Sequence, residues 1–405
     1  MGTILRLKRS PKESILKKKR SSNIELLRIL AMFFIVLHHA IVHGVLGEYV
    51  GNIYSGTIFT NHWVNITIAN ILVIVGKTGV EIFVIITGYF MITSRFKGNK
   101  LIKLWIPIWI YSVLGLVIGI LSGKFNIGII AIVKSVFPIT FVDYWFMTAY
   151  IVLYCAIPFL NILWKSINSK MKQYLLLFLF VIDVIIPTLL GGPVAEYFAS
   201  NEASQFLFLY FVGAFLREKD VLNGAYKLLG KILFCGSWAL YALLVVGFMF
   251  VTKQTGNSLI ATHAQHFAKD GSPLVLGMAV GLFIIFGGHP IKSNAFINRM
   301  STSMFAVYLI HDNQYLRVLI WHDWFHLDRL VQTTVWQMLV GVIGLSVLVF
   351  VTATIIDVIR EAFFNRIEIK ASNEIIILLR KLFSILRRNK LVDNIISFFD
   401  LRTNG

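Results

Sequence analysis

The chain has 405 residues, of which 57% are hydrophobic and only 14% are charged, and its mean hydropathy is +0.76. Soluble proteins carry about 25% charged residues, and a soluble domain of this length has too little interior to hide so much apolar surface. These values exclude an ordinary soluble enzyme, a disordered chain and a secreted disulfide scaffold. Because one span needs about 20 residues, the chain is long enough for roughly ten transmembrane helices.

The charge and cysteine content narrow the class further. The net charge of +18 arises from 38 Lys and Arg against 20 Asp and Glu. In a membrane protein we ascribe this excess to cytoplasmic loops and tails, and we expect no nucleic-acid partner because no zinc-finger or RNA-binding pattern accompanies it. Cys155 and Cys235 both lie in apolar runs. They predict neither a disulfide nor a metal site, and we expect no bound metal.

Ten apolar runs follow a basic N-terminal segment. Residues 1–23 are polar and basic and are expected to form a cytoplasmic tail. The runs lie at approximately 24–46, 64–92, 104–122, 144–163, 174–190, 204–216, 230–251, 272–289, 300–320 and 334–358. They predict an all-α, polytopic membrane helix bundle of about ten transmembrane helices, with a membrane domain over 24–358 and a tail over 359–405.

Basic residues in the loops indicate the orientation of the bundle. With the N-terminus inside, the inside loops hold most of the loop Lys and Arg residues, among them Arg95, Lys97, Lys100 and Lys103. The positive-inside rule therefore predicts that both termini are cytoplasmic. Residues 374–399 mix Ile, Leu and Phe with Arg and Lys. This pattern fits an amphipathic segment on anionic lipid or on a partner, and it fits a solvated basic tail equally well.

The first run carries the clearest set of ionisable residues. An ionisable side chain inside a span costs several kcal/mol unless it is paired, so each one marks a candidate site. Arg28 and His39 are 11 residues apart, which places them on one helix face about 16 Å apart along the axis. His43 lies about one turn beyond His39 on that face, whereas His38 points about 100° away.

Other spans add polar residues at a comparable depth. Lys77 and Glu81 are spaced i to i+4 in the second run, where an intrahelical ion pair is the simplest expectation. Counted from the ends of their spans, His39, Glu81 and His311 all fall near the midplane. A base, a carboxylate and a second imidazole at one depth are typical of a proton-transfer site.

Five ordered segments resemble one family. The pattern from Arg28 to His39 is similar to the Arg-x10-His signature of acyltransferase family 3. The remaining segments are Gly79-Val80-Glu81 through Thr87-Gly88-Tyr89, the basic loop before Pro107, Tyr144-Trp145-Phe146 through Pro158, and Ser303 through Tyr308-Leu309-Ile310-His311. The resemblance covers roughly residues 22–358. It departs from the family where Glu81 replaces a common Asp and where Lys replaces Arg in the basic loop.

The resemblance implies an enzyme of the bacterial cytoplasmic membrane. Members of this family transfer an acyl group, usually acetyl from cytoplasmic acetyl-CoA, to a hydroxyl of a cell-surface or lipid-linked glycan, and an extracytoplasmic partner can receive the group. Two other classes remain open. A proton-coupled transporter or exporter of a small solute would also have a polar midplane, and a non-catalytic membrane partner of a glycan-synthesis complex would fit the basic tail.

The resemblance also assigns candidate roles to residues. His39 is expected to act as the general base on the acceptor hydroxyl or to carry the acyl group transiently, with Glu81 or His311 orienting its ring. A second group is expected to bind the phosphates of acyl-CoA: Arg28, Arg95, Lys100 and Lys103. A third group is expected to line the acceptor pocket or simply to pack the bundle: Trp145, Tyr150 and Tyr308.

Overall fold

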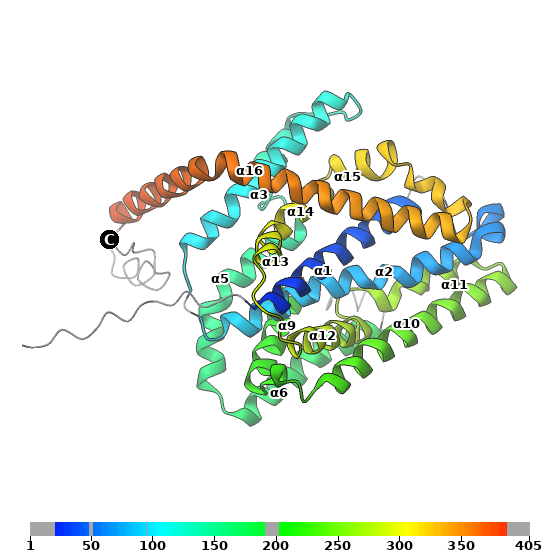
Figure 1. Ribbon diagram of the computed structural model, residues 1–405, viewed down its shortest axis with the longest axis horizontal. Helices are drawn as coiled ribbons and strands as arrows, with labels where there is room; N and C mark the ends of the chain where they lie inside the picture. The colour runs from blue at the N-terminus through cyan, green and yellow to red at the C-terminus, as the bar shows by residue number, and fades with distance from the viewer. Residues whose placement is uncertain (1–20, 48–51, 95, 191–201, 387–405) are drawn as a thin grey trace, which may run out of the picture.

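The computed structural model describes residues 21–47, 52–94, 96–190 and 202–386, and every regular element in these ranges is a helix (Figure 1). The predicted all-α class is therefore confirmed. The basic N-terminal segment up to residue 20, Arg95, and the end of the C-terminal tail lie outside the described residues.

Eight helical segments within the described ranges are long and apolar enough to cross a membrane. These are α1 with the π-helical turn η1 (Ser22–Val45), α2 (Gly56–Met91), α3 (Asn99–Ser122), α5 (Trp145–Ser166), α6 to α7 (Ser169–Leu190), α10 (Lys227–Thr255), α11 to α12 (Ser258–Gly287) and α16, which runs over Val335–Leu386. The chain is a polytopic helix bundle, and the predicted number of ten spans stays a prediction.

The other two predicted spans have a different form. The run at 204–216 lies within α9 (Glu202–Glu218), which has 17 residues and packs against α2 and α5. The run at 300–320 is not one continuous helix. It consists of α14 (Met304–His311), a break, and then α15 (Leu316–Val318) with the π-helical turn η7 (Leu319–Trp324).

Asn313 explains the break after α14. Its side-chain oxygen accepts hydrogen bonds from the backbone N–H groups of Tyr315 (3.0 Å) and Leu316 (3.3 Å). These bonds favour a new helical start over continuation of α14. Its amide nitrogen donates to the Tyr144 hydroxyl at 2.7 Å, which anchors the break to the residue that precedes α5. Interrupted helices at membrane depth are tolerated where the backbone is buried in protein, and here the interruption directly follows His311.

α1 and α2 run side by side through the centre of the bundle (Figure 1). Glycines on α2 allow the close approach. A Cβ atom at Gly76 would lie 2.2 Å from the His38 Cβ, and one at Gly79 would lie 2.4 Å from the Ala31 carbonyl oxygen. Small residues at such contacts are a common means of packing membrane helices.

α16 is a single helix of 52 residues, which Figure 1 shows extending past the bundle toward the C-terminus. At 1.5 Å per residue it is about 78 Å long, more than twice the hydrocarbon thickness. The predicted amphipathic segment thus begins as a continuation of the last span. Phe363, Ile367 and Leu378 are exposed on this continuation.

Candidate active site

His39 lies at the junction between α1 (Ser22–His39) and the π-helical turn η1 (Ala40–Val45). π-helical turns inside helices are rare and often occur at functional sites. The ring of the neighbouring His38 turns toward α2, where its Nδ1 lies 2.7 Å from the Val73 carbonyl oxygen. The adjacent imidazoles therefore differ in their hydrogen-bond partners, although both rings line one cavity.

His39 and His311 form a hydrogen-bonded relay. The His39 Nδ1 lies 2.9 Å from the His311 Nε2, and the His311 Nδ1 lies 2.6 Å from the Val307 carbonyl oxygen. A carbonyl oxygen only accepts, so the His311 Nδ1 must carry the proton in that bond. In the neutral ring the His311 Nε2 then accepts from the His39 Nδ1–H. This arrangement leaves the lone pair of His39 on Nε2.

Asp312 is a buried carboxylate beside this relay that sequence reasoning did not select. Its Oδ1 lies 3.7 Å from the His39 Nδ1, 3.8 Å from the His43 Nε2 and 3.9 Å from an Arg317 guanidinium nitrogen. These separations exceed a direct hydrogen bond. Its position directly after His311 in an apolar run was the available signal, since an intramembrane acid is a candidate in its own right.

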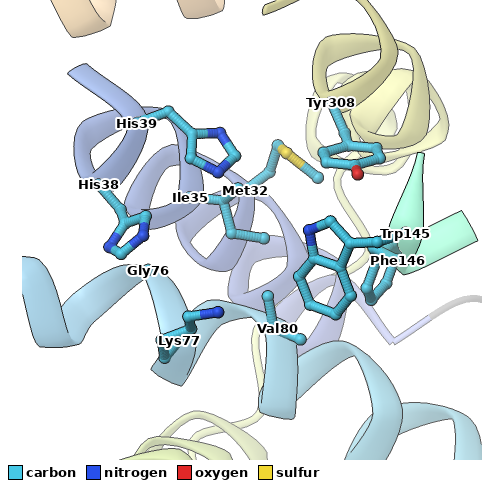
Figure 2. Close-up of a pocket in the computed structure, with 10 residues that line it drawn as sticks. All are labelled: Met32, Ile35, His38, His39, Gly76, Lys77, Val80, Trp145, Phe146 and Tyr308. Atoms are coloured by element: carbon cyan, nitrogen blue, oxygen red, sulfur yellow. The ribbon is translucent and has the colours of Figure 1, made fainter. Parts of the chain in front are cut away.

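A small cavity of about 40 Å³ opens beside His39. Figure 2 shows the side chains of α1 and α2 on one side of it and the aromatic rings of Trp145, Phe146 and Tyr308 on the other. Trp145 and Tyr308, both predicted to line an acceptor pocket, therefore share a cavity with His39. Tyr150 does not line it and belongs to a second cavity.

Lys77 also lines the His39 cavity, and its partner differs from the expected one. Its Nζ lies 2.5 Å from the Asp270 carboxylate and 5.1 Å from the centroid of the Trp145 ring. The predicted pair with Glu81 on the same helix is wrong, because Asp270, in the turn before α12, supplies the contact. The ion pair adds a charged group to a cavity that His38, His39 and Tyr308 also line.

Glu81 is buried where α2 packs against α9. Its Oε1 accepts a hydrogen bond from the Gln205 side chain of α9 at 3.0 Å, whereas its Oε2 has no hydrogen-bond partner among the residues that the structure describes. It does not line the cavity beside His39. Of the two groups expected to orient His39, the structure brings His311 into contact and directs Glu81 toward α9.

A larger cavity of about 320 Å³ lies beside Arg28, near the start of α1. Tyr150, Phe83, Phe305 and Ser301 line it together with Arg28. One guanidinium nitrogen of Arg28 donates to both carboxylate oxygens of Glu25 at 3.0 Å, and the Arg28 side chain keeps 31% of its surface exposed. Arg28 is thus held in place and still accessible.

An adjoining cavity of about 160 Å³ shares Phe305 and Thr302 with the Arg28 cavity. Lys103 of α3 and Arg360 of α16 line it. Arg360, which was not predicted, donates to Asp357 at 2.9 Å and also pairs with Glu368. Lys100 is exposed one turn before Lys103 and lines neither cavity.

Aromatic rings separate the Arg28 cavity from the His39 cavity. Phe83 and Phe305 line the former and Phe146 lines the latter. Their ring centroids lie 5.9 to 6.4 Å apart, which is within the normal range for packed aromatic pairs. The two cavities therefore face each other across one layer of side chains.

The comparison with known families decides the class of the protein. A family model described as an acyltransferase domain, that of acyltransferase family 3, matches residues 21–357. The chain belongs to acyltransferase family 3. It is accordingly a multi-pass membrane acyltransferase, and the predicted family is confirmed. No curated protein and no solved structure matches the chain significantly.

Proposed function

We propose that this acyltransferase moves an acetyl group from cytoplasmic acetyl-CoA to a hydroxyl of a cell-surface or lipid-linked glycan, in a bacterial cytoplasmic membrane. The observation that carries the proposal is the relay from Val307 through His311 to His39. It holds a largely buried imidazole with its lone pair on Nε2, in contact with a cavity lined by aromatic rings.

The chemistry assigned to His39 is general-base catalysis. The acceptor hydroxyl donates its proton to the His39 Nε2 while its oxygen attacks the thioester carbonyl carbon. The carbon–sulfur bond then breaks, and the CoA sulfur leaves with the proton that His39 had accepted. Removing a well-placed general base typically costs about 10²–10⁴-fold in rate. His311 positions the ring throughout, because its Nε2 accepts from the His39 Nδ1–H.

The donor is assigned to the cavities near the start of α1. Arg28, Lys103 and Arg360 supply cationic groups there, and Arg binds phosphate oxygens in a bidentate manner. Lys100 and Arg95 extend this basic surface along the sequence. The positive-inside rule assigns this end to the cytoplasm, where acetyl-CoA is made available.

The acceptor is assigned to the end of the bundle that holds His43. Trp145 and Tyr308 present ring faces in the His39 cavity, and Lys77 with Asp270 presents polar groups that pair with hydroxyls. The aromatic layer of Phe83, Phe146 and Phe305 must separate for the pantetheine arm to bring the thioester to His39.

A sided transfer assay tests this function. The protein is reconstituted into liposomes, acetyl-CoA with a radiolabelled acetyl group is supplied on one face only, and oligosaccharide acceptors are supplied on the other. We expect label on the acceptor when the donor is on the Arg28 side, and release of one CoA for each acetyl group transferred. Label on the acceptor only when both substrates share one face would contradict the proposal, as would the absence of transfer by well-folded protein.

A further inference from the structure

Asp312 is surrounded by nitrogen atoms at a uniform distance. The His39 Nδ1, the His43 Nε2 and an Arg317 guanidinium nitrogen all lie 3.7 to 3.9 Å from the same carboxylate oxygen. A direct hydrogen bond would be about 2.9 Å long, so none of these nitrogens is bonded to that oxygen. The spacing is that of groups that share a bridging atom.

We propose that His39, His43 and Asp312 form a binding site for a divalent transition-metal ion of the Zn²⁺ type, and that its occupation silences the acyl-transfer base.

The spacing of the ligand atoms fits such an ion. Zn²⁺ binds imidazole nitrogen and carboxylate oxygen at about 2.0–2.2 Å, and two ligands of a tetrahedral ion are then about 3.3 Å apart. The observed separations of 3.7 and 3.8 Å to Asp312 need to shorten by only about 0.5 Å. The three ligand atoms all lie within 4.8 Å of one another, so the two imidazole nitrogens approach each other by at most about 1.5 Å on binding the ion.

The local fold already positions the ligands. His39 ends α1 and His43 lies in η1, with their ring centroids 5.3 Å apart, and Asp312 follows directly after α14. His311 is a candidate fourth ligand, because its Nδ1 is held by the Val307 carbonyl oxygen and its Nε2 lies 2.9 Å from the His39 Nδ1. A ring held through its second nitrogen is the usual arrangement for metal-binding histidine.

The ligand set also selects the kind of ion. Two or three imidazoles with one carboxylate favour Zn²⁺, Cu²⁺ or Ni²⁺ over Ca²⁺ and Mg²⁺, which prefer oxygen ligands. His43 keeps 34% of its side-chain surface exposed, so an ion can enter from that end. The Arg317 side chain is 42% exposed, which lets its charge move away from Asp312 when a cation binds.

The effect on activity rests on the proposed function. A metal ion bound to the His39 Nδ1 uses the lone pair of that nitrogen. The single proton of the neutral ring must then reside on Nε2. The acceptor hydroxyl then meets an N–H group instead of a base. Metal binding and general-base catalysis by His39 are therefore mutually exclusive, and Zn²⁺ on the His43 side becomes an inhibitor of transfer.

Metal binding is tested without reference to activity. The purified full-length protein in nanodiscs is dialysed against Zn²⁺ and its metal content is determined, with the variants His43→Ala and Asp312→Asn alongside. We expect one ion per chain in the wild type and more than about 100-fold weaker Zn²⁺ binding in both variants. Loss of a group that only hydrogen-bonds to a metal ligand already lowers metal affinity by about 10–100-fold, and loss of a ligand itself costs more. His322→Ala is the matched control, because His322 lies near the same end and pairs with Asp323 at 3.0 Å. Equal binding by all four proteins, or none by the wild type, would overturn the site.

Inhibition is tested in the transfer assay, with each protein compared to its own zinc-free rate. We expect Zn²⁺ to inhibit the wild type, a chelator to restore the rate, and His43→Ala to need at least about tenfold more Zn²⁺ for half inhibition. Binding without inhibition, or transfer that requires Zn²⁺, would overturn the inhibitory role. Absence of transfer in zinc-free wild type would instead refute the proposed function and leave the binding result standing.

Discussion

The relay through His311 provides a sharp prediction, because two amide variants of one residue separate its two hydrogen bonds. Glutamine at position 311 can place an accepting oxygen near the position of the His311 Nε2, where the His39 Nδ1–H requires it. Asparagine is shorter and reaches only the Val307 carbonyl oxygen. His311→Gln therefore keeps the bond to His39, whereas His311→Asn loses it.

The expected magnitude follows from the bond that is lost. Leaving a buried N–H without an acceptor costs about 1–3 kcal/mol, and 1.36 kcal/mol corresponds to a factor of ten in rate. Asp312 lies 3.7 Å from the His39 Nδ1 and can replace part of the missing bond. We therefore expect His311→Asn to lower kcat by about 10- to 100-fold, and His311→Gln to lower it by less than about fivefold.

The assay is initial-rate transfer from acetyl-CoA by purified protein in nanodiscs, with thermal unfolding to confirm that both variants are folded. A positioning role lowers kcat and leaves the KM for acetyl-CoA nearly unchanged, because the donor is bound elsewhere. Equal loss in the two variants would refute the reasoning. So would a change confined to KM, which would indicate that His311 acts on substrate binding.

Two further predictions concern donor binding and helix packing. Arg28→Ala should raise the KM for acetyl-CoA about tenfold or more, since hydrogen bonds from a charged donor are worth about 1.5–3 kcal/mol. The KM of Arg28→Lys should lie between the values of the wild type and of Arg28→Ala. An unchanged KM in initial-rate measurements would argue against a donor site at Arg28. Gly79→Ala should destabilise the bundle by about 1–3 kcal/mol, because the new Cβ would lie 2.4 Å from the Ala31 carbonyl oxygen. In thermal unfolding, Gly247→Ala is the control with open space at its Cβ, and an equal shift in both variants would contradict the packing argument.

Periodicity along one helix was the most reliable guide from sequence to site. The spacing of His39 and His43 predicts a shared face, and the structure brings their rings to 5.3 Å even though a π-helical turn intervenes. Composition and run length likewise predict the membrane bundle. These inferences hold because they depend on local geometry that each helix determines for itself.

Contacts between helices were less predictable. Depth within a span was a sound argument for His311, but depth does not determine the direction of a side chain, and Glu81 at a similar predicted depth faces Gln205. The partner of Lys77 is Asp270, on a segment far away in sequence. The break after His311 depends on Asn313, whose capping bonds compete with an apolar pattern typical of an uninterrupted span.

The proposed metal site has no signature of this kind in the sequence. Metal sites are recognised in sequence by closely spaced ligands, and without such a cluster the sequence predicts no bound metal, which stays a prediction. Asp312 and the two histidines converge only because α14 ends beside the junction of α1 and η1. That convergence is a property of the packing and has no short-range sequence signature.

In the proposed mechanism the His39 Nε2 removes the proton from the acceptor hydroxyl. The most direct measurement is the initial rate of acetyl transfer by His39→Ala, with His263→Ala, an exposed histidine of η5 (His263–Ala268), as the matched control. We expect the transfer rate of His39→Ala to fall by at least about 100-fold at an unchanged thermal midpoint, and the control to keep the wild-type rate. Transfer by folded His39→Ala within a few-fold of the wild-type rate would contradict this mechanism.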